Sequence, residues 1–321
     1  MGIDLPEEHM KIYITGATGV LGKRIIKELS GLGHTVVGMA RSARGEETVR
    51  SMGGVPSRAD LFDKDAVLKD IEGSDVVIHA ATSIPVKKRL KPEDFRLNDR
   101  IRREGTQIVT DCAVEAGARK LIFQDVVWVA RPEDGSFYDE DSPVVPSPTV
   151  QSGLDGEGIV LGAGENRGIV ATVLRCGFFY GADTAHTRQM GAGLKKRAFP
   201  IIGDGEALWS LIHIDDVASA FAAAALEDLP GIWHVVDDRP VKTGDFLSYF
   251  AGRIGAQRPY RFPVWLARFL AGSYAVEFFT ASNNTSSAKL KAASSWSPKY
   301  PTYREGIPEV VREWKAEGFL L

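Results

Sequence analysis

Three glycines at a fixed spacing form the part of this sequence that could bind a phosphorylated ligand. They occur in Thr15-Gly16-Ala17-Thr18-Gly19-Val20-Leu21-Gly22, directly after an apolar run and at the start of a helical pattern. Gly16 permits a tight turn, Gly19 lets the backbone approach a pyrophosphate, and Gly22 lets the helix pack closely on the strand. Backbone amides and the helix dipole would then bind the phosphates. We therefore expect a dinucleotide site with contacts from Gly16, Thr18, Gly19, Val20, Leu21 and Gly22.

The residues after the second predicted strand indicate which dinucleotide is bound. An acidic side chain at this place usually holds the ribose 2′-hydroxyl of NAD. Here the strand Thr35–Ala40 is followed by Arg41-Ser42-Ala43-Arg44, which contains no acid. A guanidinium can pair with a 2′-phosphate through two hydrogen bonds, whereas a carboxylate would repel it. We predict NADP(H) rather than the alternative NAD(H), with Arg41 as the main contact and Ser42 and Arg44 as helpers. The other interpretation is that these arginines only solvate a loop.

Short apolar runs alternate with helical patterns through the first half of the chain. Several of the runs are continuously apolar, as in strands that are buried on both faces of a parallel sheet. The predicted strands are Lys11–Thr15, Thr35–Ala40, Val55–Ala59, Asp75–Ala80, Lys120–Val127 and Ile169–Arg175. The predicted helices are Val20–Leu32, Lys64–Ile71, Phe95–Ala116 and Ser152–Glu165. This alternation predicts an α/β fold with a Rossmann-type, doubly wound parallel sheet.

The pattern loosens after Tyr180, where short mixed elements predominate. The predicted elements there are helices at Asp215–Leu226, Thr243–Ile254 and Val264–Leu270 and a strand at Gly231–Val236. We expect a dinucleotide-binding domain over residues 10–180. Residues 181–321 should mainly form a smaller α/β substrate lobe, with some chain returning to the first domain. The following aromatic residues are expected to line the substrate cavity or to join the core: Phe178, Phe179, Trp209, Phe262, Trp265, Phe269, Tyr274, Phe278 and Phe279.

The overall composition excludes several classes of protein. The 321 residues carry 39 Lys and Arg against 42 Asp and Glu, a net charge of −3, which gives no electrostatic footprint for nucleic acid or for a membrane surface. With only two cysteines, neither a disulfide framework nor a thiolate metal site is expected. The first ten residues are acidic and polar, unlike a secretory signal. We predict a cytoplasmic protein that binds a small molecule and no metal, nucleic acid or membrane.

Taken together, the motifs resemble those of the extended short-chain dehydrogenases/reductases, the epimerase/dehydratase-like branch, over residues 10–315. The glycine spacing is the first of them. The others are Asp60-Leu61, His79-Ala80-Ala81-Thr82, Leu174-Arg175-Cys176-Gly177-Phe178-Phe179-Tyr180-Gly181, Ile202-Gly203-Asp204-Gly205, His213-Ile214-Asp215-Asp216-Val217-Ala218, Trp296-Ser297-Pro298 and Tyr303-Arg304-Glu305-Gly306. The resemblance implies a nicotinamide cofactor with further contacts from Asp60, Leu61, Ala80, Ala81, Thr82, Cys176 and Phe178. It also implies a homodimer formed through the helices at Phe95–Ala116 and after Thr149.

The resemblance also implies a catalytic set that this sequence lacks. The family uses a tyrosine as proton donor, a lysine four residues later that lowers the pKa of the tyrosine, and a serine or threonine after the fifth strand. In the matching register Thr149 replaces the tyrosine, Gly153 the lysine and Val126 the serine. A threonine hydroxyl without a neighbouring cation is too weak an acid to protonate an alkoxide efficiently. The usual proton relay therefore cannot operate, although cofactor binding does not depend on these residues.

Asp125 is the residue that we consider as a substitute. It lies near the carboxyl end of the fifth predicted strand, at the edge where open α/β sheets bind their ligands. If it faces the cofactor, desolvation raises its pKa and lets it act as an acid or a base. The alternative is that its side chain caps nearby backbone amides or pairs with an arginine.

Three functions stay open on the sequence alone. The first is an NADP(H)-dependent oxidoreductase that acts on a small, rather hydrophobic molecule with a non-standard proton donor. The second is a catalytically silent NADP(H)-binding or regulatory protein. The third is a lyase or isomerase that uses the cofactor structurally or transiently.

The helix after Thr149 departs from the family pattern in a second way. It contains Gly153, Gly156, Gly158, Gly162 and Gly164. Each glycine costs about 1 kcal/mol relative to alanine inside a helix. We therefore expect this helix to be broken or shortened.

Overall fold

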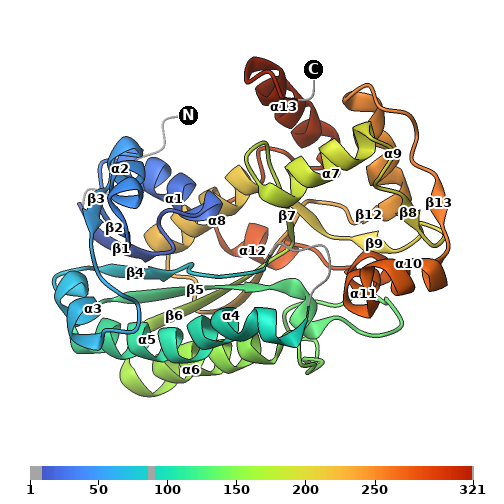
Figure 1. Cartoon of the computed structure of the whole chain (residues 1–321). Coiled ribbons are helices and arrows are strands. Elements are labelled where there is room, and N and C mark those ends of the chain that lie inside the picture. Colours follow the sequence, from blue (N-terminus) through green and yellow to red (C-terminus); the bar gives the residue numbers. More distant parts are fainter. Residues whose placement is uncertain (1–8, 86–90, 320–321) are drawn as a thin grey trace.

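A seven-stranded parallel sheet forms the centre of the protein in a computed structural model that describes residues 9–85 and 91–319 (Figure 1). Its strands are β1 (Lys11–Thr15), β2 (Thr35–Met39), β3 (Val55–Ser57), β4 (Val76–His79), β5 (Lys120–Val126), β6 (Val170–Cys176) and β11 (Gly231–Val235). Their order across the sheet is β11-β6-β5-β4-β1-β2-β3. The chain winds outward from β1 in one direction and from β4 in the other, which confirms the predicted Rossmann-type fold.

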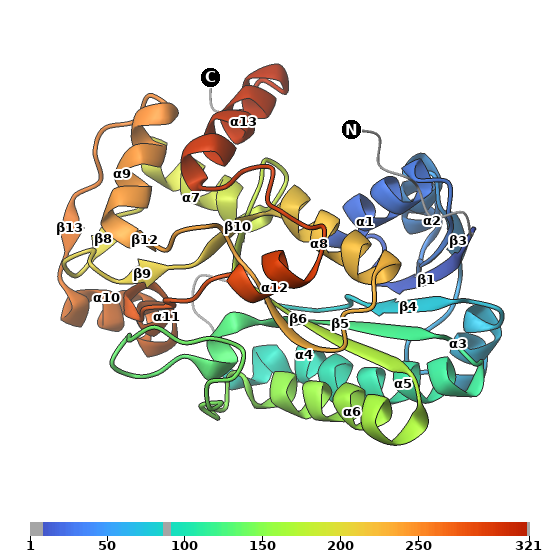
Figure 2. The same cartoon turned by 180° about the vertical axis from the view of Figure 1, so that it is seen from behind.

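Helices cover both faces of this sheet (Figures 1 and 2). One face carries α1 (Val20–Gly31), α2 (Ala43–Ser51) and α8 (Ile214–Leu226). The other carries α3 (Lys64–Ile71), α4 (Arg96–Arg100), the π-helical segment η2 (Ile101–Gly105), α5 (Thr106–Glu115) and α6 (Gln151–Arg167). Strand side chains alternate between the two cores: Ile12 and Ile14 belong to the first, and Tyr13 belongs to the second. The strands are therefore apolar on both faces, which is why they appear in the sequence as continuous apolar runs.

Helix α6 runs unbroken over 17 residues, so the prediction of a broken or shortened helix is wrong. A Cβ added at Gly153, Gly156 or Gly164 would lie 2.6 or 2.7 Å from a side-chain atom of β5 or β6. The glycines therefore allow α6 to lie closer to the sheet than a helix of larger residues could. Packing on the sheet stabilises the helix and outweighs the low helix propensity of glycine.

The chain beyond β6 builds a small lobe beside the carboxyl end of the sheet (Figure 1). Its helices are α7 (Ala185–Lys195), α9 (Thr243–Arg253), α10 (Val264–Ala271), α11 (Ser273–Thr280) and α13 (Tyr303–Ala316). Three short strand pairs join them: β7 (Phe178–Tyr180) with β10 (Leu211–His213), β9 (Leu208–Trp209) with β12 (Val241–Lys242), and β8 (Ile201–Ile202) with β13 (Arg261–Phe262). Between these segments the chain returns to the sheet through α8, β11 and the short α12 (Ala288–Ala293), which packs against β11.

The aromatic residues of the lobe divide into two groups. Phe178, Trp209, Phe278 and Phe279 form a cluster in which ring centroids lie 5.2–6.3 Å apart. By contrast, Trp265 and Phe269 on α10 are 71% and 77% exposed, so the prediction that they line the cavity or join the core is wrong. Both project from a short helix at the outer end of the lobe, where a sequence pattern alone does not reveal which face is covered. The side chain of Tyr274 lies outside the described part of the structure.

Two other sequence-based expectations concern the surroundings of the protein. Within residues 9–85 and 91–319, no helix is both long and apolar enough to cross a membrane. Cys112 and Cys176 are both free and buried. The acidic leader, residues 1–8, lies outside the described residues.

Candidate functional site

The glycine loop between β1 and α1 has the geometry of a phosphate cradle. Gly16 has φ +74°, and a Cβ there would lie 2.5 Å from the carbonyl oxygen of Ala80 on the neighbouring strand end. A Cβ on Gly22 would lie 2.3 Å from the carbonyl oxygen of Gly16. Gly19 is the N-cap of α1 and has no side-chain acceptor for the first amides of the helix. The loop therefore leaves these amides free to bind an anion beside the carboxyl end of the sheet. This arrangement fits the pyrophosphate of a dinucleotide.

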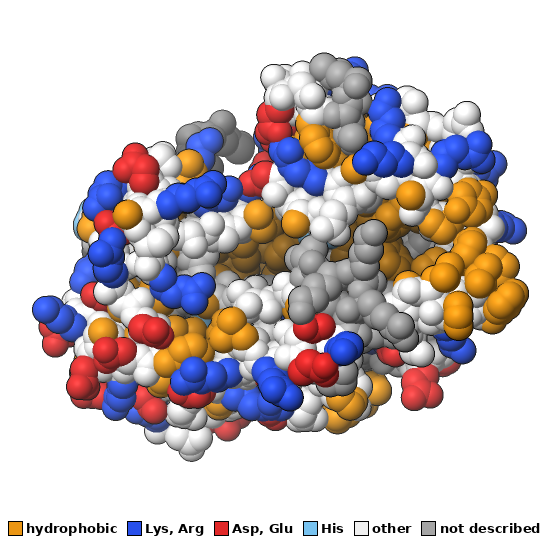
Figure 3. Space-filling view, in the orientation of Figure 1, with side chains coloured by type: hydrophobic (Ala, Val, Ile, Leu, Met, Phe, Trp, Pro, Cys, Tyr) orange, Lys and Arg blue, Asp and Glu red, His pale blue; other side chains and the backbone are white. Residues whose placement is uncertain are grey.

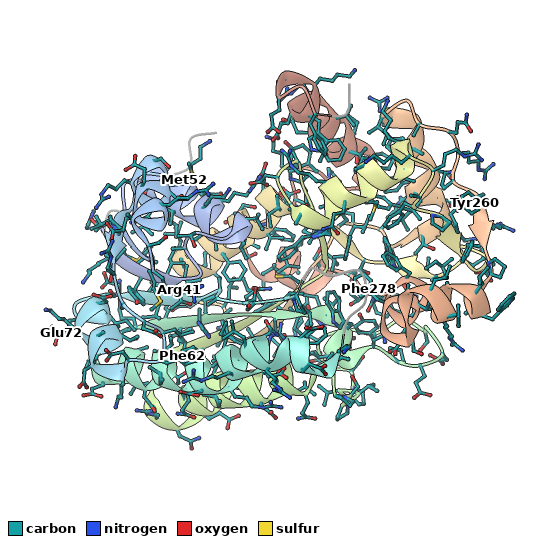
Figure 4. The ribbon with its side chains drawn as sticks, viewed as in Figure 1. Arg41, Met52, Phe62, Glu72, Tyr260 and Phe278 are labelled. Carbon is teal, nitrogen blue, oxygen red and sulfur yellow. The ribbon has the colours of Figure 1, made fainter. Side chains whose placement is uncertain are left out.

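The residues proposed to select the cofactor, Arg41, Ser42 and Arg44, follow the end of β2. Arg41 and Arg44 are exposed, and Figure 4 shows Arg41 in the half of the molecule that contains β1–β3. The hydroxyl of Ser42 accepts a hydrogen bond of 3.2 Å from the Gly45 amide and so caps α2. Helix α2 is absent from the predicted elements, and it places Arg41 and Arg44 at its N-terminus. The assignment of a 2′-phosphate to these side chains stays a prediction.

The side chains of the remaining predicted cofactor contacts differ in their exposure to solvent. Asp60 and Thr82 are exposed, whereas Leu61 and Ala80 are buried and Ala81, Val20 and Phe178 are half-buried. The carboxylate of Asp60 accepts a hydrogen bond of 2.9 Å from the Phe62 amide, which fixes the turn after β3. Thr18 is exposed and Leu21 is buried.

Cys176 is completely buried in the core between the sheet and α8, and burial raises the pKa of its thiol. Its side chain therefore offers no surface to a cofactor, and the predicted role of Cys176 in cofactor binding stays a prediction. A contact of Cys176 with the cofactor is left to its backbone.

The three positions of the missing catalytic set lie close together in the chain fold. Thr149 is exposed in the turn before α6, and its hydroxyl lies 2.9 Å from that of Ser147. Val126 ends β5 and is 5% exposed. Gly153 is buried in the first turn of α6. These three residues supply neither an acidic hydroxyl nor a cation beside one. The structure therefore brings the three positions together without a group that could donate the proton as the family's tyrosine does.

Two buried ion pairs occupy the space beneath Gly153. Asp125 lies 2.9 Å from Arg102, and Glu157 accepts two hydrogen bonds of 2.7 Å from Arg175. All four side chains are at most 5% exposed. Burial raises the pKa of Asp125 to about 7, although the charge of Arg102 opposes the shift; the neighbouring Glu157 carboxylate adds to it. We refer to these four residues as the buried quartet.

The buried quartet explains why glycine stands at position 153. A Cβ there would lie 2.6 Å from the Arg102 Nη1 and 2.6 Å from the Asp125 Oδ2. A lysine side chain at this position would have to displace the pair. Asp125 therefore has the arginine partner that the alternative interpretation predicts, and its role in proton transfer stays a prediction.

Replacing Asp125 by asparagine should change how stability depends on pH. The pKa of Asp125 is raised from 3.8 to about 7. Between these values the folded chain keeps a proton that the unfolded chain has lost, so the contribution of Asp125 to stability falls as the pH rises through this window. Asparagine does not titrate, so the stability of Asp125→Asn relative to the parent should increase between about pH 5 and about pH 8.

Urea unfolding of both proteins at the two pH values measures this difference. Asp155→Asn, which removes a half-buried carboxylate on the outer side of the same helix α6, is the control and should show no comparable trend. A relative stability that stays constant or decreases with pH would contradict the raised pKa.

A pocket of about 310 Å³ opens next to Thr149. Its walls come from the 3₁₀ turn η3 (Val127–Ala130) that follows β5, the residues directly after η3, the loop before α6, and the end of α11. The lining residues are Trp128, Arg131, Pro132, Glu133, Val145, Pro146, Ser147, Thr149, Val150, Glu277, Phe278, Ala281 and Ser282. Figure 3 shows that this face of the molecule is hollowed between the two halves, with hydrophobic side chains in the hollow. The volume and lining suit a small, partly aromatic ligand.

Sequence reasoning identified only Thr149 and Phe278 among the residues of this pocket. Trp128 and Arg131 were missed, although both follow the carboxyl end of β5, where open α/β sheets bind ligands. Position relative to the strand end was therefore a usable signal. Glu277 carried no comparable signal, because α11 reaches the pocket only through the folding of the lobe.

Comparisons with known proteins agree with this arrangement. The family model described as the NAD dependent epimerase/dehydratase family matches residues 12–235. A relative from Streptomyces, 3-diazoavenalumate denitrifying reductase, is 31% identical over 310 residues, which cover 93% of this chain and 99% of the relative. A ketoreductase from Stigmatella aurantiaca, which acts on 4-hydroxy-2-methyl-3-oxo-4-farnesyl-3,4-dihydroquinoline-1-oxide, is 27% identical over 248 residues, 74% of this chain and 72% of the relative.

Solved structures share the fold. The human epimerase family protein SDR39U1, crystallised with NADPH, superposes with a TM-score of 0.80 at 17% identity and covers 94% of this chain and 99% of that protein. At this identity the likeness shows the fold alone. The family is shown by two other findings. The family model matches most of the chain, and the Streptomyces relative is 31% identical over 93% of it. The chain therefore belongs to the NAD dependent epimerase/dehydratase family.

Proposed function

We propose that this protein is an NADP(H)-dependent reductase that transfers a hydride to an electrophilic aromatic acceptor. The observation that carries the proposal is the replacement of the family's proton-donating pair by Thr149 and by Gly153, whose surroundings exclude a lysine. The cofactor cradle is intact beside them, and a pocket of about 310 Å³ adjoins Thr149. An open pocket favours turnover over a silent binding protein, whose pocket would be filled by bulky side chains.

The dinucleotide would bind along the carboxyl end of the sheet. The amides at Gly19 and Val20 would hold the pyrophosphate, and the Arg41 guanidinium would pair with the 2′-phosphate. Figure 4 shows Arg41 on the sheet half and Phe278 at the lobe, so a ligand that spans both would lie across the end of the sheet. The NADPH in the human structure is consistent with this choice of cofactor. When bound, the nicotinamide supplies a hydride to an acceptor in the pocket.

The kind of acceptor follows from what the pocket lacks. Reduction of a ketone adds a hydride to carbon and needs a proton for the alkoxide, which an acid must donate. A cationic acceptor needs no such proton. An aryl diazonium ion takes a hydride on its terminal nitrogen to give a neutral diazene, Ar–N=N–H, which loses N₂ and leaves Ar–H. The name of the Streptomyces relative describes a reductase that removes nitrogen from a diazo compound, which supports an acceptor of this class.

Replacing Arg41 by alanine should weaken NADPH binding by about 10- to 100-fold, because a charge-assisted, two-point hydrogen bond contributes about 1.5–3 kcal/mol. NADH has no 2′-phosphate, so its affinity should change little. Titration calorimetry with both dinucleotides measures the two affinities. Arg50→Ala, which removes an exposed arginine from the same region, should leave both unchanged. Equal losses for NADPH and NADH would show that Arg41 does not read the 2′-phosphate.

The proposed function is tested by following NADPH absorbance with the purified protein and 4-carboxybenzenediazonium, with matched 4-carboxyacetophenone as the ketone. We expect protein-dependent oxidation of NADPH with the diazonium, release of N₂, and little oxidation with the ketone. Faster turnover of the ketone would contradict the proposal. Conversion of either compound that depends on the protein but involves no net oxidation of NADPH would also contradict it and would favour the lyase or isomerase alternative.

A further inference from the structure

Among the described residues that line the pocket, Arg131 is the one cation, and it is the less exposed partner of an ion pair. The Arg131 side chain is 21% exposed and lies directly after η3, which anchors it to the end of β5. Its Nη2 donates a hydrogen bond of 3.0 Å to the Glu277 carboxylate on α11. Glu277 is 64% exposed. The guanidinium is thus held in the pocket wall, while its partner lies mostly in water.

Such a pair contributes little to stability. Exposed ion pairs are worth about 0–1 kcal/mol, because water solvates both partners well when they separate. A carboxylate on a ligand inside the pocket would meet Arg131 on its less exposed side and could accept two hydrogen bonds from the planar guanidinium. Glu277 could then turn into solvent at small cost. Among the described lining residues, the other charged side chain is that of Glu133, which is exposed, so water and salt screen it.

Aromatic rings define the rest of the shape. Trp128 from η3 and Phe278 from α11 both line the pocket, and they meet edge to face with centroids 6.0 Å apart. Pro132 and Pro146 add flat apolar surface. Walls of this kind favour a planar ring system, because offset and edge-to-face contacts between aromatic rings are energetically favourable. The second cavity behind Trp128 and Phe278 has only about 10 Å³ of free space, so the ring stays on the Arg131 side.

We propose that this pocket recognises planar aromatic carboxylates, and that Arg131 binds the ligand carboxylate in exchange for Glu277. The proposal rests on the proposed function, because it identifies this pocket as the substrate site. It adds that the substrate is an anion at the end away from the reacting group. Arg131 and Glu277 then have opposite effects on the same ligand: Arg131 attracts the carboxylate, and Glu277 competes with it.

The test uses unreactive ligands, so that binding is measured apart from hydride transfer. The probes are trans-cinnamate and its neutral counterpart cinnamamide, titrated by calorimetry into the full chain with and without NADP⁺. Replacing Arg131 by methionine should weaken cinnamate binding by about 10-fold or more, because it removes a charge-assisted pair. Replacing Glu277 by glutamine should strengthen cinnamate binding by a few-fold, about 2- to 5-fold, since a competing surface pair is removed. Neither change should alter cinnamamide binding by more than about 2-fold.

Controls separate this proposal from a general loss of structure. Arg103→Met removes an exposed arginine outside the pocket and should leave both affinities unchanged. Equal losses of cinnamate and cinnamamide in Arg131→Met, weaker cinnamate binding in Glu277→Gln, or no measurable binding of cinnamate to the parent protein would each overturn the proposal. A protein that reduces benzenediazonium, which carries no carboxylate, but does not bind cinnamate would refute this inference and leave the proposed function standing. A protein that binds cinnamate through Arg131 but oxidises no NADPH would refute the proposed function and leave the binding of aromatic carboxylates by Arg131 standing.

Discussion

Replacing Glu157 by glutamine is expected to lower the free energy of unfolding by about 3 kcal/mol, which is among the larger losses that one substitution causes. Glu157 holds Arg175 through two hydrogen bonds of 2.7 Å, and both side chains are almost completely buried. A neutral amide would leave the guanidinium in the protein interior without this counter-charge. Asp125 would ionise more readily once the Glu157 charge is gone, and this offsets part of the loss.

Urea unfolding at neutral pH measures this change. Glu165→Gln, an exposed position on the same helix α6, is the matched control and should change stability by no more than about 0.5 kcal/mol. A loss of less than about 1 kcal/mol for Glu157→Gln would mean that the buried quartet tolerates a missing charge, contrary to this account.

Replacing Gly153 by alanine should lower the free energy of unfolding by about 1–3 kcal/mol, the usual cost of overpacking a filled interior. The added Cβ would lie 2.6 Å from both Arg102 and Asp125, and neither can move without weakening their ion pair. The same substitution at Gly158 meets no atom within 4 Å and should raise stability by about 0.5–1 kcal/mol, because alanine favours the helix.

The pair of alanine variants differs only in its surroundings, so opposite signs in thermal or urea unfolding would isolate the effect of the buried quartet. A stabilising Gly153→Ala would instead show that position 153 has room for a side chain. That result would remove the structural reason for the missing lysine. Because lysine carries the same Cβ, the tyrosine–lysine pair cannot be rebuilt at positions 149 and 153 while Arg102 and Asp125 keep their places.

Features set by local chemistry could be predicted from the sequence. The glycine loop is one, because Gly16 and Gly22 leave no room for a Cβ against backbone atoms and so impose a visible spacing. The buried parallel strands are another, because both of their faces are covered and their sequences are continuously apolar. The gap in the catalytic set depends only on the register of the loop before α6, and it stays a prediction.

Features that depend on packing between distant segments could not be predicted. By helix propensity alone, the glycines of α6 predict an unstable helix. In the folded chain they instead allow α6 to pack closely against β5 and β6. The partner of Asp125 belongs to η2, and only the folded chain brings the two together. In the same way, the pocket acquires Glu277 from a helix of the lobe, and the exposed side of α10 cannot be told from its covered side by composition.

We expect this family member to pass a hydride to an acceptor that needs no proton from a tyrosine. The most direct measurement counts the products formed from NADPH and 4-carboxybenzenediazonium, with and without the protein. We predict that the protein forms one NADP⁺, one N₂ and one benzoate for each diazonium ion consumed. Benzoate formed without NADP⁺, or formed equally fast without the protein, would contradict this expectation.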